Sequence, residues 1–190
     1  NLYQSGKLDQ TYLDATQARE LKGKPDFVSY KQARTNYLEF NQTKKVLQNT
    51  KVRQALSYAV DRKQLVNKVL GNGSLTVTGI VSKGLTQFDG KDFSVLQDTK
   101  TGANYNLAQA KKLWQEGLKE AGVSKVSLNL LGDDDGVSKN VTEYLQSQLE
   151  QHLKGLTVTV NNVPKKTRIA KSESGDFDLV LSGWAADYSD

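Results

Sequence analysis

Apolar and polar residues recur along the chain with two distinct periods, one helical and one typical of strands. Helical spacing of the apolar positions predicts amphipathic helices over 8–21, 50–70, 106–121, 137–153 and 164–172. Short apolar or alternating runs predict strands over 27–30, 36–41, 126–131, 156–160 and 177–181. After residue 100 helices and strands alternate, which favours an α/β fold with helices packed on a sheet.

Local signals refine these elements in the first half of the chain. The strands 27–30 and 36–41 are expected to pair with each other, and a polar loop follows as far as Asn49. The long periodic segment is interpreted as two helices that meet at Val60 and Asp61, with Asp61 as an N-cap. Gly71 is expected to end the second helix, since the glycines after it lack the Gly-Lys-Ser/Thr of a phosphate loop.

Residues 71–104 are expected to form a long irregular loop region. The segment has little periodicity, and it contains five glycines from Gly71 to Gly90 inclusive. Farther on, Asp133, Asp134 and Asp135 lack the alternating ligands and distant Glu of an EF-hand. They are interpreted as the start of the next helix, where acidic groups favour the positive end of the dipole.

Composition indicates an ordinary globular protein and narrows the possible chemistry. The chain has 190 residues, a formal net charge of +5, no Cys and no Met, and it begins with Asn1. Because Asn1 is not an initiator Met and the chain has no Met, it is interpreted as part of a larger protein. The absence of Cys excludes cysteine-based zinc sites. A basic helix carries Lys165, Lys166, Arg168 and Lys171. No aromatic stacking platform is interleaved with these residues, so a solvated face is expected and no nucleic-acid partner.

The last predicted strand leads directly into Gly183, Trp184, Asp187 and Tyr188. Ligands of α/β domains commonly bind at strand ends, where an indole and a carboxylate could hold an apolar group and a cation. The alternative is a core Trp followed by a capping Asp. Catalysis is not expected, because His152 is the only His and no serine-nucleophile motif accompanies it. No metal and no cofactor are expected either.

Four motifs, in order, resemble the oligopeptide-binding (peptide and nickel) family of extracellular solute-binding proteins of ABC importers. They are YLEFN (37–41), NTKVRQALSYAVDR (49–62), NLAQAKKL (106–113), and the pair GDFDL (175–179) and GWAADY (183–188). Together they extend over most of the chain. The resemblance implies a two-lobed binding protein, of which this chain is most of the second lobe, with a mixed sheet and helices packed on it.

The same resemblance implies a ligand-binding set of Gly183, Trp184, Ala185, Asp187 and Tyr188. Main-chain groups of Gly183 and Ala185 would bond an extended peptide, the Asp187 carboxylate would pair with its α-ammonium, and Trp184 would pack on a ligand side chain. Leu181 departs from members that carry an Arg facing the cleft at that position. Side-chain preference and peptide length therefore stay open.

The function implied is the substrate-binding component of an oligopeptide importer, without catalysis. Its expected partners are an oligopeptide ligand and ABC permease subunits in the membrane, and it is expected to be monomeric. It would lie outside the cytoplasm, either as a lipoprotein anchored at the cell surface or in the periplasm. The alternative is a surface adhesion or signalling module that binds proteins or polysaccharide through basic faces.

Overall fold

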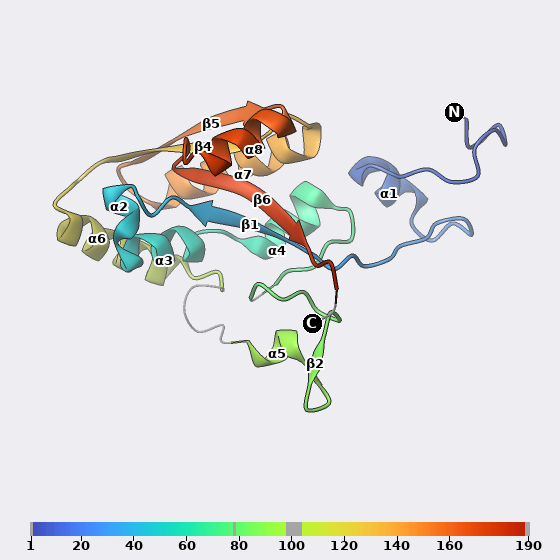
Figure 1. Ribbon diagram of the computed structural model, residues 1–190, viewed down its shortest axis with the longest axis horizontal. Helices are drawn as coiled ribbons and strands as arrows, with labels where there is room; N and C mark the ends of the chain where they lie inside the picture. The colour runs from blue at the N-terminus through green and yellow to red at the C-terminus, as the bar shows by residue number, and fades with distance from the viewer. Residues whose placement is uncertain (1, 78, 98–103, 189–190) are drawn as a thin grey trace.

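A four-stranded mixed sheet forms the centre of the molecule (Figure 1). The computed structural model describes residues 2–77, 79–97 and 104–188. The strands lie in the order β1 (Arg34–Phe40), β6 (Leu179–Ala185), β4 (Val126–Asp133) and β5 (Leu156–Val163). β4 runs parallel to both β5 and β6, whereas β1 runs antiparallel to β6. The predicted mixed α/β arrangement is therefore confirmed.

Helices occupy most of the connections between strands. They are α1 (Ala15–Leu21), α2 (Lys45–Gln48), α3 (Thr50–Tyr58), α4 (Arg62–Gln64), the π-helix η1 (Leu65–Leu70), α5 (Phe93–Leu96), α6 (Leu107–Ala121), α7 (Gly136–His152) and α8 (Lys165–Glu173). In the described part of the chain, none of them is long and apolar enough to cross a bilayer.

The predicted helix caps are present. The side chain of Asn106 accepts a hydrogen bond from the Gln109 amide at 3.0 Å, and Asp61 accepts one from Gln64 at 2.9 Å. Each bond satisfies an amide that the first turn of a helix leaves without an intrahelical partner. Gly71, after η1, adopts the left-handed conformation at φ 58° that was expected of a glycine C-cap.

The two faces of the sheet have cores of unequal size. The larger core joins α3, α6 and α7 to one face of the sheet, and Trp114 on α6 is its largest fully buried side chain. On the other face, which α8 contacts, a small cluster contains Leu131, Phe177 and Val180, with Val163 packed against it. Successive residues of a strand point to opposite faces, so β4 and β6 each contribute to both cores.

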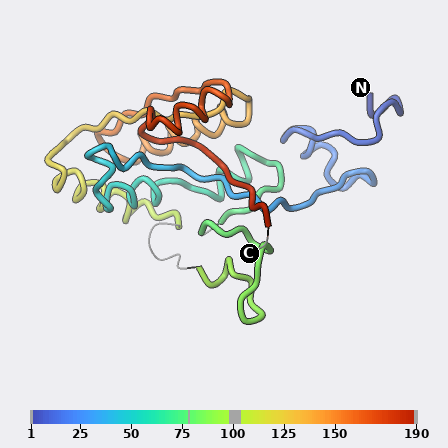
Figure 2. Tube along the Cα trace, viewed as in Figure 1, coloured from blue at the N-terminus to red at the C-terminus, as the bar shows by residue number. Residues whose placement is uncertain are grey.

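The prediction for the N-terminal segment is wrong in two respects. The helix begins at Ala15 rather than near Leu8, because Asp14 and Gln17 form a capping box there. None of its residues is buried, so its apolar positions form no core. Figure 2 shows this segment to one side of the sheet, beyond the start of β1.

The predicted hairpin between 27–30 and 36–41 is also wrong. Residues 27–30 are not a strand, and β1 pairs instead with β6, about 140 positions later in the chain. Asn41 fixes this distant pairing, because its side-chain amide donates to the carbonyl oxygens of Gly175 at 3.0 Å and Phe177 at 2.8 Å. The polar loop expected up to Asn49 contains the short helix α2.

The described residues of the segment 71–104 project from one end of the sheet (Figure 1). Its described residues include a small hairpin of β2 (Gln87–Phe88) and β3 (Lys91–Asp92), followed by α5. Gln97 braces the segment, since its side-chain amide donates to the Val81 carbonyl at 3.0 Å and accepts from the Val81 amide at 2.9 Å. Positions 78 and 98–103 of the expected loop region lie outside the described residues.

Candidate functional site

β6 changes from a central strand to an edge strand along its own length. Its ladder with β4 consists of only two pairs, Leu130 with Leu179 and Leu131 with Val180. Its ladder with β1 continues to the pair of Arg34 and Ala185. The last residues of β6 therefore have a neighbouring strand on one side and an open edge on the other.

The hydrogen bonds at the two ends of the β1–β6 ladder show which backbone groups face that open edge. The Ala186 amide donates to the Ala33 carbonyl at 2.8 Å, and the Asn41 amide donates to the Asp178 carbonyl at 2.9 Å. In an antiparallel pair, hydrogen-bonded and non-hydrogen-bonded residues alternate. Even-numbered residues of β6 thus bond to β1, and the N–H and C=O groups of Gly183 and Ala185 point away from it.

The open edge begins where β4 and β6 part, and polar side chains fill the divergence. Asn162 on β5 donates from its amide to the Asp133 carbonyl at 2.8 Å. Arg168 on α8 donates from Nε to Asp133 Oδ1 at 2.9 Å and from Nη1 to Ser182 Oγ at 3.4 Å. One guanidinium thus contacts the last residue of β4 and a residue of β6.

Trp184 lies beside this edge with most of its surface exposed, at 66%. Its cross-strand partner is Thr35 on β1, which is buried. The Thr35 hydroxyl donates to the Ile80 carbonyl at 2.8 Å and lies 2.7 Å from Ser82 Oγ, in the projecting segment. The projecting segment is thereby attached to the sheet directly opposite the indole.

Two side chains from β1 closely approach the backbone of Gly183. A β carbon at this position would lie 2.2 Å from Asn36 Oδ1 and 2.6 Å from Arg34 Nη2. These two side chains are themselves joined by a hydrogen bond of 3.2 Å from Arg34 Nε to Asn36 Oδ1. Side chains of β1 consequently fill the space beside the Gly183 backbone on this face.

Asp187 and Tyr188 follow β6 and are both exposed. The carboxylate of Asp187 forms no hydrogen bond or ion pair within the described ranges 2–77, 79–97 and 104–188. An exposed, unpaired carboxylate can accept a cationic group without first breaking an internal contact.

The structure thus brings the five predicted ligand-binding residues together at one end of β6, with one correction of their local structure. The strand was predicted to end at 181, so that Gly183, Trp184 and Ala185 would follow it, but these three residues lie within the strand. The strand also begins later, at Leu179. Leu181 packs against the larger core. The apolar run marked only the part of β6 that is buried, whereas backbone pairing with β1 extends the strand further.

Sequence reasoning missed Arg168 and Asp133. Arg168 was assigned to the solvated face of a basic helix, but its side chain is only 11% exposed and forms an ion pair with Asp133, which is 22% exposed. Asp133 was expected to open the helix α7, a role that Asp135 performs by accepting bonds from the Val137 and Ser138 amides. No local sequence signal pairs Arg168 with Asp133, because 35 positions separate them.

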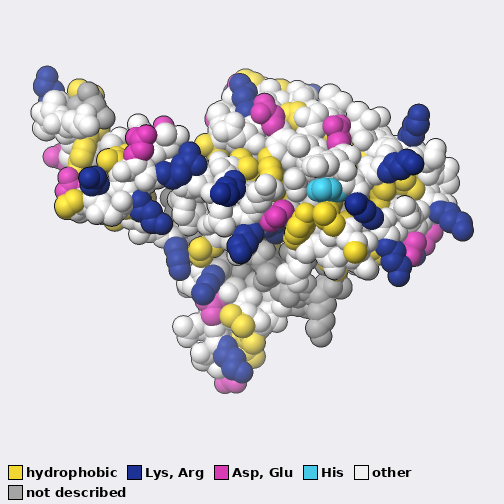
Figure 3. Space-filling model, turned by 180° about the vertical axis from the view of Figure 1, so that it is seen from behind, with side chains coloured by type: hydrophobic (Ala, Val, Ile, Leu, Met, Phe, Trp, Pro, Cys, Tyr) yellow, Lys and Arg dark blue, Asp and Glu magenta, His cyan; other side chains and the backbone are white. Residues whose placement is uncertain are grey.

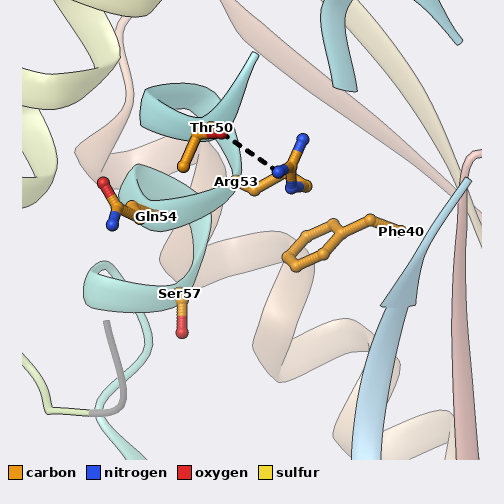
Figure 4. A pocket seen from close by; sticks show the side chains of 5 residues that line it. All are labelled: Phe40, Thr50, Arg53, Gln54 and Ser57. Atoms are coloured by element: carbon orange, nitrogen blue, oxygen red, sulfur yellow. Dashed lines mark hydrogen bonds between the residues drawn. The ribbon is translucent and has the colours of Figure 1, made fainter. Parts of the chain in front are cut away.

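A hollow of about 320 Å³ lies away from this site, beside α3. Figure 4 shows its lining, which consists of Phe40, Thr50, Arg53, Gln54 and Ser57. The guanidinium of Arg53 is already engaged, because it donates to the carbonyl oxygens of Leu47 at 2.7 Å and Gln48 at 2.8 Å, and to Thr50 Oγ1 at 3.1 Å. The charge that could attract an anion there instead caps the end of α2.

The single His is separate from the open edge of β6. His152 is the last residue of α7, and in Figure 3 it lies next to hydrophobic side chains on the rear face. Burial lowers its pKa from the usual value, and the positive charge of Lys111 lowers it further. Within the described residues, no group of His, Asp and Glu side chains could hold a metal ion.

This chain is similar in sequence and in fold to proteins that are named for peptide binding. A dipeptide-binding protein of Lactococcus lactis subsp. cremoris (strain MG1363) is 38% identical over 201 residues, covering 100% of this chain and 36% of that protein. The structure of Listeria monocytogenes OppA bound to peptide has 34% identity and a TM-score of 0.90. The structure of the pheromone receptor PrgZ has 38% identity and the same TM-score.

Both structural matches cover 100% of this chain and 38% of the matched chain, so the chain spans little more than a third of the length of these proteins. They confirm the predicted fold class, a mixed sheet with packed helices that forms one lobe of a periplasmic-binding-protein-like fold. The family described as bacterial extracellular solute-binding proteins, family 5 Middle, matches residues 1–190. The chain therefore belongs to family 5 of the bacterial extracellular solute-binding proteins.

Proposed function

We propose that this chain is the peptide-holding lobe of the substrate-binding component of an ABC-type oligopeptide importer. The observation that carries the proposal is the open edge of β6, where the backbone groups of Gly183 and Ala185 point away from β1. Membership of a solute-binding family, and similarity to proteins named for dipeptide and oligopeptide binding, support the same function.

An extended peptide would bind as an added strand along this edge. Main-chain hydrogen bonds to Gly183 and Ala185 do not depend on the ligand's side chains, so they suit a protein that accepts many sequences. Only alternate residues of a strand direct their backbone groups to one side. Gly183 and Ala185, which a single residue separates, can therefore both bond to one extended peptide strand.

The charged and aromatic residues would fix the peptide's position along the edge. The Asp187 carboxylate would pair with the α-ammonium group, which every peptide with a free N-terminus carries. The exposed ring of Trp184 would pack on a ligand side chain, and Tyr188, which is 73% exposed, would extend that aromatic surface. These roles require no catalysis, and none is proposed.

The partners and location follow from the importer function and are likewise proposals. The complete protein would enclose the peptide between this lobe and the other lobe, and would deliver it to permease subunits in the membrane. It would lie outside the cytoplasm as a monomer, either anchored to the membrane by a lipid or free in a periplasm.

The test is a thermodynamic cycle on the full-length protein. Asp187→Asn removes the charge but keeps the shape of the side chain, and we expect it to weaken tetraalanine binding by about 3 kcal/mol if the ion pair is buried when the peptide is bound. N-acetyltetraalanine, which lacks the α-ammonium, should bind weakly to both proteins and equally well to each. Isothermal titration calorimetry measures all four affinities.

The matched control is Asp9→Asn, which removes an exposed carboxylate from the N-terminal segment. It should leave the affinity for tetraalanine unchanged. Equal tetraalanine affinities of wild type and Asp187→Asn would exclude the proposed role of Asp187.

The alternative, an adhesion or signalling module that binds through basic faces, has less support. On the face in Figure 3, Lys and Arg side chains are dispersed among acidic ones instead of forming a single patch. On α8, Arg168 and Lys171 are already paired with Asp133 and Asp176. Binding through exposed charges weakens with added salt, so a ligand whose affinity collapsed with ionic strength would favour this alternative.

A further inference from the structure

β4 and β6 separate like the arms of a fork, although β4 itself continues as a regular strand. β4 stays paired with β5 as far as Asp133 and Val163, whereas its ladder with β6 stops at Leu131 and Val180. The divergence therefore begins in the middle of the sheet, between two strands that could both continue. We call this divergence the β4–β6 fork.

The backbone group that could close the fork is already occupied. In a parallel ladder continued at the same register, the Asp133 carbonyl would accept the Gly183 amide. Instead it accepts the side-chain amide of Asn162 at 2.8 Å, and Asn162 Oδ1 in turn accepts the Thr142 hydroxyl at 3.2 Å. Gly132 leaves room for this arrangement, because a β carbon there would lie 2.8 Å from Asn162 Nδ2.

Arg168 connects the two arms of the fork. Its Nε is 2.9 Å from Asp133 Oδ1 on β4, and its Nη1 is 3.4 Å from Ser182 Oγ on β6. The side chain is nearly buried, and it enters the fork from α8. A planar guanidinium holds its donors at fixed positions, so contacts on both sides fix the spacing between the strands in a way that a flexible ammonium group would not.

We propose that Arg168 is a positioning residue that sets the width of the β4–β6 fork and so keeps the Gly183 and Ala185 backbone available to the ligand. Ser182 immediately precedes Gly183, so a displacement of Ser182 moves the peptide-binding edge. The inference rests on the proposed peptide-binding function for its consequence. The mechanical part, that Arg168 holds the end of β6, can be tested without a peptide.

The variants separate the two ends of the connection. Arg168→Met removes both contacts and keeps an unbranched side chain in place of the aliphatic part of the arginine. Ser182→Ala removes only the contact to β6 and leaves the ion pair with Asp133 intact. Lys171→Met is the matched control, because it removes a cation from the same helix whose partner, Asp176, lies outside the fork.

The first measurement is hydrogen–deuterium exchange of the peptide-free, full-length protein. The amides of Ser182 and Trp184 bond to β1, so loosening the end of β6 should accelerate their exchange in both Arg168→Met and Ser182→Ala. Exchange in β5 should stay unchanged in Ser182→Ala, and Lys171→Met should resemble wild type. Unchanged exchange at 182–185 in both fork variants would overturn the proposal.

The second measurement is the affinity for tetraalanine, with the melting temperature as a parallel readout. Arg168→Met should weaken binding about tenfold, a size typical of coupling between neighbouring groups. Ser182→Ala should weaken binding with little change in melting temperature, and it should have no further effect in the Arg168→Met background. If Arg168 only stabilised the fold, the effects of Arg168→Met and Ser182→Ala would be non-additive in the melting temperature and not in the affinity.

The two measurements distinguish failure of the inference from failure of the function. If Arg168→Met binds tetraalanine as tightly as the wild type does, the positioning role is refuted and the peptide-binding function stands. Wild-type protein that binds no peptide would refute the proposed function, and the exchange rates would still decide whether Arg168 holds the fork.

Discussion

Gly183 and Asn36 face each other across β6 and β1, and the Asn36 side chain occupies the space that a β carbon at position 183 would need. The two strands can pair closely here because one of the facing residues has no side chain. The arrangement also places polar groups on the face of the sheet that carries the larger core, because a hydrogen bond from Arg34 holds Asn36 there.

Gly183→Ala should therefore destabilise the fold by about 1 kcal/mol, because the exposed ends of Asn36 and Arg34 can move aside at modest cost. It should also weaken peptide binding by shifting the backbone at the open edge. Urea unfolding and calorimetry measure the two effects. Adding Asn36→Ala should restore part of both, and a double variant as impaired as Gly183→Ala alone would contradict the steric explanation.

Asn41 joins the end of β1 to the segment that leads into β6. Its amide donates to two carbonyl oxygens, and its Oδ1 accepts from the Thr43 amide at 3.1 Å and the Thr43 hydroxyl at 2.7 Å. Asn41→Ala should lower the free energy of unfolding by about 2–4 kcal/mol, since buried partners lose their bonds. Urea unfolding measures this loss. Asn140→Ala, at an exposed position of α7, should have little effect, and equal losses in the two variants would refute the role of Asn41.

Gly117 allows α6 to approach α3 closely. A β carbon there would lie 2.8 Å from Val52 Cγ2 and 3.0 Å from the Val52 backbone nitrogen. Helix propensity alone would make Gly117→Ala stabilising by up to about 1 kcal/mol, but overpacking should reverse the sign and destabilise by about 1–3 kcal/mol. Thermal and urea unfolding give the sign directly. The control is Gly136→Ala, where no atom lies within 4 Å, and this change should be neutral or stabilising.

The protonation of His152 should make the protein less stable in acid. Burial and then the charge of Lys111 lower the pKa of His152 in the folded protein below its unfolded value of about 6.5. The unfolded chain therefore binds the proton first as the pH falls. The stabilising contribution is present above about pH 6.5 and is lost as the pH falls through the lower, folded-state pKa.

Urea unfolding at a series of pH values between 8 and 5 should show a smaller acid-induced loss for His152→Gln than for wild type. Lys111→Gln should reduce the loss in part, because it removes one of the two causes. An identical pH dependence for wild type and His152→Gln would show that this histidine does not contribute.

Local chemistry made many elements predictable from the sequence. Asn106, Asp61 and Gly71 act on amides and dihedral angles within a few residues of themselves, so their sequence positions were sufficient. The α/β class followed from the alternation after residue 100, whereas the mixed sheet was implied by the family resemblance. The start of α1 was misplaced because apolar residues such as Leu8 and Tyr12 stay exposed, and without burial their spacing carries no structural information.

Long-range pairing accounts for the parts that the sequence did not reveal. β5 continues through Asn161 and Asn162, and β6 through Ser182, because backbone bonds to a neighbouring strand hold these residues whatever their side chains are. For the same reason, the partner of β1 could not be found from local alternation. The motifs indicated the candidate ligand-binding residues, but the direction of each backbone group was deduced from the bond between the Ala186 amide and the Ala33 carbonyl.

Because the direction of the backbone groups alternates along β6, the number of residues between its buried part and the binding edge decides which amides face the ligand. Val180 is fixed in a core on one side of the sheet, and Gly183 follows it by three positions. Inserting a single residue between them would turn the amides of Gly183 and Ala185 toward β1 and present those of Trp184 to the ligand. Only an insertion of two residues would leave the amides of Gly183 and Ala185 pointing to the open edge in a regular strand.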